Sequence, residues 1–172
     1  MSGRYVSKAF TREDGAEPLP TVPPRAPLPE GVPNYVTPRG LARLREELAE
    51  LSVERANAER DLSGVSRTRA LTQLAVRRSE LEGRIASAEL VPPSSGPVDT
   101  VRFGATVSVD GEGGVRQYRI VGVDEADASR GRISFVSPLA RALLGRAVGD
   151  SVHVRTPSGE EELEIASVEY GP

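Results

Sequence analysis

The chain has 172 residues, a formal net charge of −3 at pH 7 and no cysteine. This length allows one medium domain or two small ones, and the mild charge excludes a general electrostatic attraction to nucleic acid or to anionic lipid. The sequence contains no cysteine, no apolar run of membrane length and no signal peptide, which excludes a disulfide framework, a thiolate metal site and a membrane span, so we expect a cytoplasmic protein.

Residues 1–36 are rich in proline. Eight of the 14 prolines lie between Pro18 and Pro38, and large apolar residues are few in this stretch. Proline removes backbone donors and favours extended conformations, so we predict a leader that is disordered or that becomes ordered only on contact with another surface.

Residues 37–91 have the pattern of two helices that fold back on each other. Their apolar residues recur mostly at steps of three and four, which places them on one narrow seam of each helix. The seams are formed by Leu41, Leu44, Leu48, Leu51, Ala58 and Leu62 in the first arm and by Leu71, Leu74, Leu81, Ile85 and Ala88 in the second. Two such seams suit an antiparallel coiled coil about 37 Å long, and a rod of that length on a small protein is suited to probing a partner.

The ends of the first arm and the turn have local signals. Thr37 is a good N-cap, and Pro38 fits the first helical position, where its missing N–H costs nothing. We place the tip of the hairpin at residues 61–66, where Gly64 can adopt a left-handed conformation and Ser66 can cap the second arm. A single unbroken helix is the alternative, but Gly64 would weaken it at its midpoint.

Three residues depart from the pattern of the hairpin. Arg55 and Arg78 interrupt the two seams. Either their aliphatic stems pack while the charged groups reach water, or they belong to a basic face that meets a partner. Gly83 lowers the helix propensity of the second arm by about 1 kcal/mol relative to alanine, and we expect it to allow close approach of the two helices.

After a proline-rich linker at residues 92–98, the period of the apolar residues changes from helical to alternating. The glycine-rich residues 110–114 predict a β-hairpin between the first two strands, and residues 138–144 are predicted to form a short helix. The predicted strands are residues 105–109, 115–124, 132–136, 151–156 and 161–170. We therefore expect residues 99–172 to form a small antiparallel sheet holding one short helix, which gives the chain an α+β fold.

Two features of this domain could carry chemistry but have simpler explanations. The loop at residues 124–127 is acidic, and we expect it to be solvated rather than to bind a metal ion. His153 is the single histidine, and it lies in an alternating strand without a nucleophile or carboxylate pattern around it, so we expect a structural role. No pattern typical of an enzyme is present.

Several stretches of the chain match a known family. They are residues 7–11 at the N-terminus, 34–40 and 44–48 in the first arm, 82–85 in the second arm, 149–159 and 169–170, and above all the block Ser137-Pro138-Leu139-Ala140-Arg141-Ala142-Leu143-Leu144-Gly145. Together they resemble the bacterial GreA/GreB transcript cleavage factors, with a GreB-type start. The resemblance covers nearly the whole chain.

This resemblance implies a fold and a partner. It implies that the C-terminal domain is FKBP-like and docks at the rim of the secondary channel of RNA polymerase, and that the coiled coil enters the channel toward the active site. The residues that it assigns to polymerase binding are Ser137, Pro138, Leu139, Ala140, Arg141, Leu144 and Gly145.

In that family the hairpin tip carries two carboxylates, spaced as Asp-Leu-Lys-Glu. They help to hold a second Mg²⁺ and its water in the polymerase active site, and hard oxygen ligands are what Mg²⁺ requires. Here Asp61-Leu62-Ser63-Gly64 stands at that position, so Asp61 matches the first carboxylate and Gly64 replaces the second. Between residues 40 and 83 the hairpin is also shorter than is usual in the family, by about one heptad.

The neighbours of Asp61 do not replace the lost carboxylate. Glu59 is a weak candidate, because helical residues two apart point to different faces. The arginines near the tip, Arg60, Arg67 and Arg69, would repel a cation, although they could approach phosphates of nascent RNA or of a nucleotide.

Three functions are compatible with these features of the sequence. The first is a monomeric Gre-like regulator that binds RNA polymerase, has no cofactor of its own and places a cleavage-poor tip in the channel, modulating elongation, pausing or initiation. The second is an active cleavage-stimulating factor that uses Asp61 with the Mg²⁺ of the polymerase. The third is a coiled-coil module that assembles with itself and has no polymerase partner.

Overall fold

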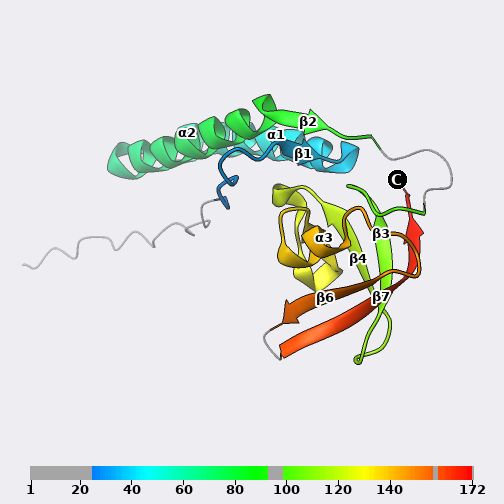
Figure 1. Ribbon diagram of the computed structural model, residues 1–172. Coiled ribbons are helices and arrows are strands. Elements are labelled where there is room, and N and C mark those ends of the chain that lie inside the picture. Colours follow the sequence, from blue (N-terminus) through cyan, green and yellow to red (C-terminus); the bar gives the residue numbers. More distant parts are fainter. Residues whose placement is uncertain (1–24, 93–98, 157–158, 172) are drawn as a thin grey trace, which may run out of the picture.

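The computed structural model describes residues 25–92, 99–156 and 159–171. In Figure 1 a long helical hairpin projects to one side, and a small β domain lies beneath the base of the hairpin. The prediction of a disordered leader concerns mainly residues 1–24, which lie outside the described residues, as does most of the linker predicted at 92–98.

The hairpin consists of helix α1 (Pro38–Asp61, 24 residues) and helix α2 (Gly64–Ala86, 23 residues). Thr37 caps α1, since its side chain accepts a hydrogen bond from the backbone N–H of Gly40. The predicted helical hairpin is therefore confirmed.

The turn between the two helices is tighter than predicted. Gly64 has a φ of 56°, the left-handed conformation expected for it. It nevertheless belongs to α2, and the residue that precedes this helix is Ser63 rather than Ser66. The turn therefore comprises only Leu62 and Ser63.

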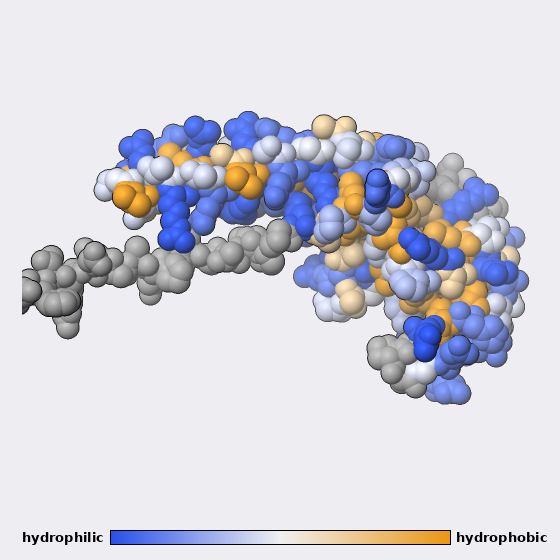
Figure 2. All heavy atoms as spheres, turned by 60° about the vertical axis from the view of Figure 1, so that its left-hand side comes forward, coloured by the Kyte–Doolittle hydropathy of each residue, from blue (hydrophilic) through white to orange (hydrophobic). Residues whose placement is uncertain are grey.

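The two arms bury one continuous seam between them. The most deeply buried side chains of the hairpin come from both helices and from the strand before α1, and they are Val36, Leu44, Leu51, Ala58, Ala70 and Leu81. Arg55 and Arg78 form ion pairs along their own helices, with Glu59 and Glu82. On the face seen in Figure 2 the hairpin is mostly hydrophilic, with only scattered hydrophobic side chains. The apolar surface of the seam is thus used within the hairpin itself.

Gly83 does not have the role that its position in α2 suggests. A Cβ added at this residue would meet no atom of the described residues within 4 Å. The expectation that Gly83 brings the helices close together is therefore wrong, because its free side faces away from α1.

A small parallel sheet closes the base of the hairpin. Strand β1 (Asn34–Val36) pairs with strand β2 (Ala88–Leu90). The side chain of Asn34 donates hydrogen bonds to the carbonyl of Arg84, at 2.9 Å, and to the hydroxyl of Ser87, at 3.0 Å, and so caps the end of α2. Residues 34–36 are thus not part of a leader and residues 88–90 are not helical, because each segment supplies the other's backbone partners.

The β domain contains strands β3 (Thr106–Asp110), β4 (Arg116–Val121), β5 (Arg132–Ser134), β6 (Ser151–Thr156) and β7 (Gly159–Glu169). They form one sheet in the order β5-β4-β3-β7-β6. Three of the four pairings are antiparallel, but β4 and β5 run parallel. The connection between them crosses over through two 3-10 helices, η1 (Val123–Glu125) and η2 (Ala128–Arg130). The prediction of a purely antiparallel sheet is therefore wrong at this edge, where β5 runs parallel to β4.

The short helix α3 (Pro138–Leu143) packs against the sheet, as predicted. Val107, Ile120, Leu143, Leu163 and Ile165 are among the fully buried side chains of this core. The α+β fold is therefore confirmed. In the part of the chain that the structure describes, no helix is both long and apolar enough to span a membrane.

The seam predicts how stability depends on single side chains. Leu81 of α2 is 0% exposed, so Leu81→Ala should lower the free energy of unfolding by about 2–5 kcal/mol through lost burial and a cavity. Val76→Ala, on the outer face of the same helix, should change it by less than about 0.5 kcal/mol. Urea unfolding followed by circular dichroism measures both changes, and equal effects would contradict this packing.

Candidate functional site

The tip of the hairpin is an exposed turn with one carboxylate at the end of α1. Asp61 is the last residue of α1, and its side chain is 57% exposed. The neighbouring guanidinium of Arg60 donates two hydrogen bonds to this carboxylate, from Nε to Oδ1 at 2.8 Å and from Nη2 to Oδ2 at 3.1 Å. These hydrogen bonds raise the pKa of Arg60, whose guanidinium is charged at neutral pH in any case. Both oxygens of Asp61 therefore already face a cation.

The other groups near Asp61 do not complete a metal site. Glu59 is turned back along α1 and pairs with Arg55 at 2.9 Å. Gly64 carries no side chain, and the space around it is open. Within the described ranges no group of three or more acidic or histidine side chains could hold a metal ion. The tip thus does not fit Mg²⁺ as a pair of free carboxylates would.

The remaining predicted tip residues lie in the turn and in the first two turns of α2. Ser63, Arg67 and Arg69 are exposed, and Leu62 is half-buried. None of the ion pairs recorded among the described residues involves Arg67 or Arg69. These arginines are therefore available to an anionic partner.

The predicted polymerase-binding block surrounds α3. Ser137 caps this helix by accepting a hydrogen bond from the backbone N–H of Ala140, at 3.2 Å. Ala140 is fully buried, so its side chain belongs to the core and is not part of the exposed surface of the block. Leu139 and Leu144 also pack against the core. The exposed members of the block are Pro138, Arg141 and Gly145.

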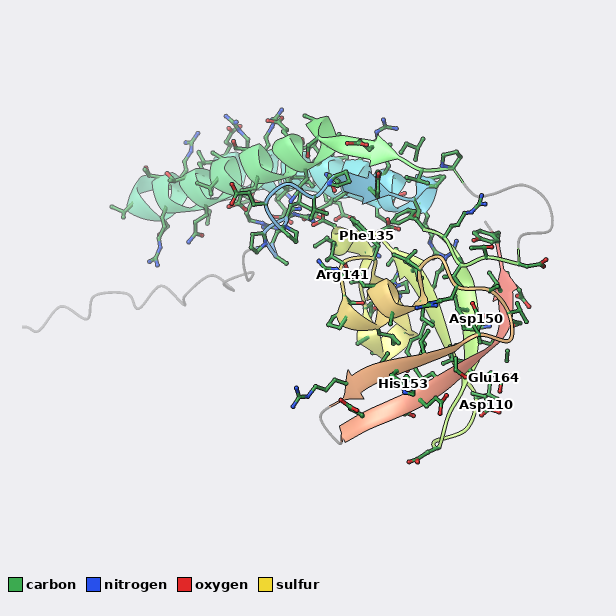
Figure 3. The ribbon with its side chains drawn as sticks, in the orientation of Figure 1. Asp110, Phe135, Arg141, Asp150, His153 and Glu164 are labelled. Atoms are coloured by element: carbon green, nitrogen blue, oxygen red, sulfur yellow. The ribbon has the colours of Figure 1, made fainter. Side chains whose placement is uncertain are left out.

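His153 lies on the outer face of β6, opposite Glu162 of β7. Figure 3 shows it on the far side of the β domain from the hairpin. Its side chain is exposed, so the structural role expected for it is not one of core packing.

The acidic loop at residues 124–127 holds the hairpin, a role that its sequence does not reveal. Glu125 is only 7% exposed. Its carboxylate accepts a hydrogen bond from the backbone N–H of Thr37, at 2.8 Å, and a second one from the hydroxyl of Thr37. The loop was expected to be solvated, and this expectation is wrong. The N-cap of α1 is itself anchored to the β domain.

Two glycines make this anchor possible. A Cβ at Gly40, in the first turn of α1, would lie 2.1 Å from the carboxyl carbon of Glu125, and a Cβ at Gly122 would lie 2.4 Å from the carbonyl oxygen of Tyr35. Glycine has a low helix propensity, so Gly40 in the first turn of α1 was a signal in the sequence for a close approach at this point.

Aromatic rings fill the remainder of the junction. Tyr35 of β1 contacts Phe103 and Phe135 of the β domain, with ring centroids 5.8 and 5.4 Å apart. The two phenylalanine rings contact each other edge to face at 5.7 Å. The base of the hairpin therefore meets the β domain through a packed, partly apolar interface.

Comparison with known proteins gives a consistent result. Residues 96–170 match the family model for the C-terminal domain of transcription elongation factors GreA/GreB. The transcription elongation factor GreA of Anaeromyxobacter sp. (strain K) is 46% identical over 154 residues, which cover 78% of this chain and 91% of that protein. GreB of Neisseria meningitidis serogroup A is 38% identical over 153 residues, with coverages of 80% and 94%. A solved GreA/GreB structure from Nitrosomonas europaea is 28% identical and covers 79% of this chain and 98% of its own, with a TM-score of 0.40.

The junction predicts opposite effects for two glycines in the same hairpin. Gly40→Ala should lower the free energy of unfolding by about 2 kcal/mol or more, because the new methyl group would overlap the Glu125 carboxylate. Gly83→Ala should raise it by about 0.5–1 kcal/mol, because its site is open and alanine favours the helix. Chemical denaturation of both variants checks the pair, and stabilisation by Gly40→Ala would contradict the close contact.

Proposed function

The chain belongs to the GreA/GreB family of transcription elongation factors, and on that premise we propose that it binds RNA polymerase and extends its hairpin into the secondary channel while supporting little transcript cleavage. The observation that carries this proposal is the state of the tip. A single carboxylate, Asp61, stands there, and Arg60 occupies both of its oxygens.

The β domain supplies the docking surface. The exposed members of the block around α3 are Pro138, Arg141 and Gly145. In Figure 3, Arg141 lies on the side of the β domain toward which the hairpin extends. A partner bound at this surface would therefore have the hairpin alongside it. At about 1.5 Å per residue, α1 carries the tip about 36 Å from its start, which is long enough to reach into a channel.

The tip places charge but cannot organise a metal ion. Hydrolysis with two metal ions requires both ions to be clamped at the scissile phosphate by oxygen ligands. Asp61 could contribute one ligand, but Arg60 would have to leave it, and Gly64 contributes none. Arg67 and Arg69 bring further positive charge, which opposes a cation and favours phosphate groups. The tip is therefore suited to occupying the channel rather than to delivering Mg²⁺.

One observation keeps an active cleavage-stimulating factor as a second candidate. Arg60 and Asp61 are both largely exposed, and an ion pair in water is easily exchanged for another partner. A metal ion already held by the polymerase could therefore displace Arg60. Self-assembly of the hairpin is disfavoured, because its apolar seam is buried between its own two arms.

Cleavage in backtracked elongation complexes separates these two candidates. With Mg²⁺ present, we expect slow release of short 3′ RNA fragments and an effect of Asp61→Ala smaller than about twofold. Gly64→Glu should restore little activity, because the second carboxylate would sit on a shorter hairpin with a different loop. Rapid cleavage that Asp61→Ala abolishes would show that the second candidate is correct.

Binding to core polymerase tests the docking surface. Arg141→Glu should weaken binding by about tenfold or more, because it reverses the charge of an exposed side chain within the docking block. Arg155→Glu, a matched reversal on the outer face of β6, should change affinity by less than about twofold. Affinity can be measured by fluorescence anisotropy of a labelled chain. No binding of the wild-type protein at micromolar concentration would refute the proposed function.

A further inference from the structure

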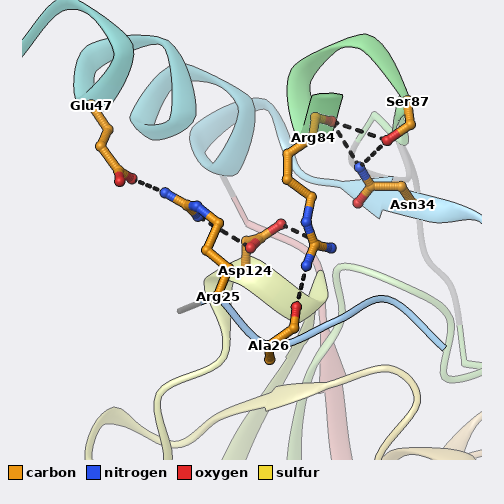
Figure 4. A network of polar contacts seen from close by, with 7 residues as sticks. All are labelled: Arg25, Ala26, Asn34, Glu47, Arg84, Ser87 and Asp124. Atoms are coloured by element: carbon orange, nitrogen blue, oxygen red, sulfur yellow. Dashed lines mark hydrogen bonds and ion pairs between the residues drawn. The ribbon is translucent and has the colours of Figure 1, made fainter. Parts of the chain in front are cut away.

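A chain of charged side chains crosses the junction beside the Thr37–Glu125 contact. Figure 4 shows its four members: Glu47 of α1, Arg84 of α2, Asp124 of η1, and Arg25 of the segment that precedes β1. These residues are far apart in the sequence and come from both the hairpin and the β domain.

The charges in this chain alternate in sign. Arg25 donates hydrogen bonds to Glu47 and, at 3.2 Å, to Asp124. On its other side the carboxylate of Asp124 faces Arg84, at 3.6 Å. Arg84 also donates to the backbone carbonyl of Ala26, so the segment around Arg25 contacts both helices of the hairpin. Two positive and two negative groups leave the network close to neutral.

Arg25 bridges the hairpin and the β domain through its hydrogen bonds to Glu47 and Asp124. The side chain of Asp124 is 6% exposed, so water cannot easily replace a lost partner. Arg25 donates a hydrogen bond to Oδ1 of Asp124. Among the described residues, Oδ2 of Asp124 and the Nη1 atom of Arg84 that faces it have no hydrogen-bond partner. Burial alone would lower the pKa of Arg25, but its hydrogen bonds to Glu47 and Asp124 raise it above the usual value. The guanidinium is thus a permanent cation between two carboxylates.

The Arg25–Glu47 contact lies far enough along α1 to control the direction of the hairpin. The Thr37–Glu125 contact fixes the start of α1, and by itself it would act as a pivot. Glu47 lies ten residues further on, which is about 15 Å along the helix axis. The tip lies at about 36 Å, so any displacement at Glu47 is enlarged more than twofold at Asp61.

We propose that Arg25 is a positioning residue, which fixes the angle between hairpin and β domain and thereby decides where the tip points. The segment before the first helix then acts as a strap across the junction. The consequence for tip placement inside a polymerase rests on the proposed function, whereas the effect on the angle is a property of the free protein.

The test measures the angle in the full-length protein. Because the chain has no cysteine, Val65→Cys at the tip and His153→Cys on β6, both exposed, can carry two spin labels for pulsed electron paramagnetic resonance. We expect one narrow distance distribution, which Arg25→Ala should broaden at least twofold. Arg25→Lys should give an intermediate width, because an ammonium group keeps the charge but not the two-sided fork.

The control is Arg45→Ala, which removes an exposed arginine from the same part of α1 and should leave the distribution unchanged. A purely stabilising role of Arg25 would lower the unfolding midpoint of Arg25→Ala without broadening the distribution, and that result would overturn the proposal. So would equal widths for Arg25→Ala and Arg45→Ala.

Binding to core polymerase provides an independent test of the role of Arg25. Arg25→Ala should change the affinity for core polymerase by less than about threefold, because the docking surface around α3 is unchanged. In the complex it should broaden the distribution of distances to the label at the tip. Failure of the wild-type protein to bind would remove the proposed function, but the distances in the free protein would still decide the role of Arg25.

Discussion

The structure depends on one buried carboxylate. Glu125 of the β domain accepts hydrogen bonds from the backbone N–H and the hydroxyl of Thr37, while that hydroxyl also caps α1 through Gly40. One threonine therefore begins the helix and ties it to the other domain. A carboxyl group at 7% exposure needs such donors in place of water, so separating the two domains here would break both hydrogen bonds to Thr37.

Rigidity is passed from this junction to the tip by the hairpin itself. The buried seam joins the two arms, and the pairing of β1 with β2 closes their base, so the arms move as one body. Asn34 strengthens this closure by satisfying backbone oxygen at the end of α2. Because the hairpin is held in this way, the orientation of its base determines the position of its tip. A factor that reaches into a channel requires such a fixed tip.

The tip of the hairpin is where the proposed function is decided. The C-terminal domain matches the GreA/GreB family model, and the chain is 46% identical to a GreA over 154 residues. Asp61 is the single acidic side chain in the turn region 60–69, where arginines outnumber it. We infer a factor whose effect on transcription comes from where it sits rather than from a metal ion that it carries.

The sequence by itself determined the features that depend on neighbours along the chain. These include the two amphipathic helices, the Thr37-Pro38 start, the left-handed Gly64, the short helix after Ser137 and the single carboxylate, Asp61, near the turn. Only the tertiary structure decided the features that depend on distant partners. Strands β1 and β2 exist because they pair with each other, although the paired residues Asn34 and Ala88 are 54 positions apart in the sequence. The β4–β5 pair is parallel because of its crossover, and Ala140 is buried by the sheet behind it. From the sequence, Asp124 and Glu125 were predicted to lie in a solvated loop. Their partners Arg25, Arg84 and Thr37 are 40 to 99 residues away in the sequence, so no local pattern could predict these contacts.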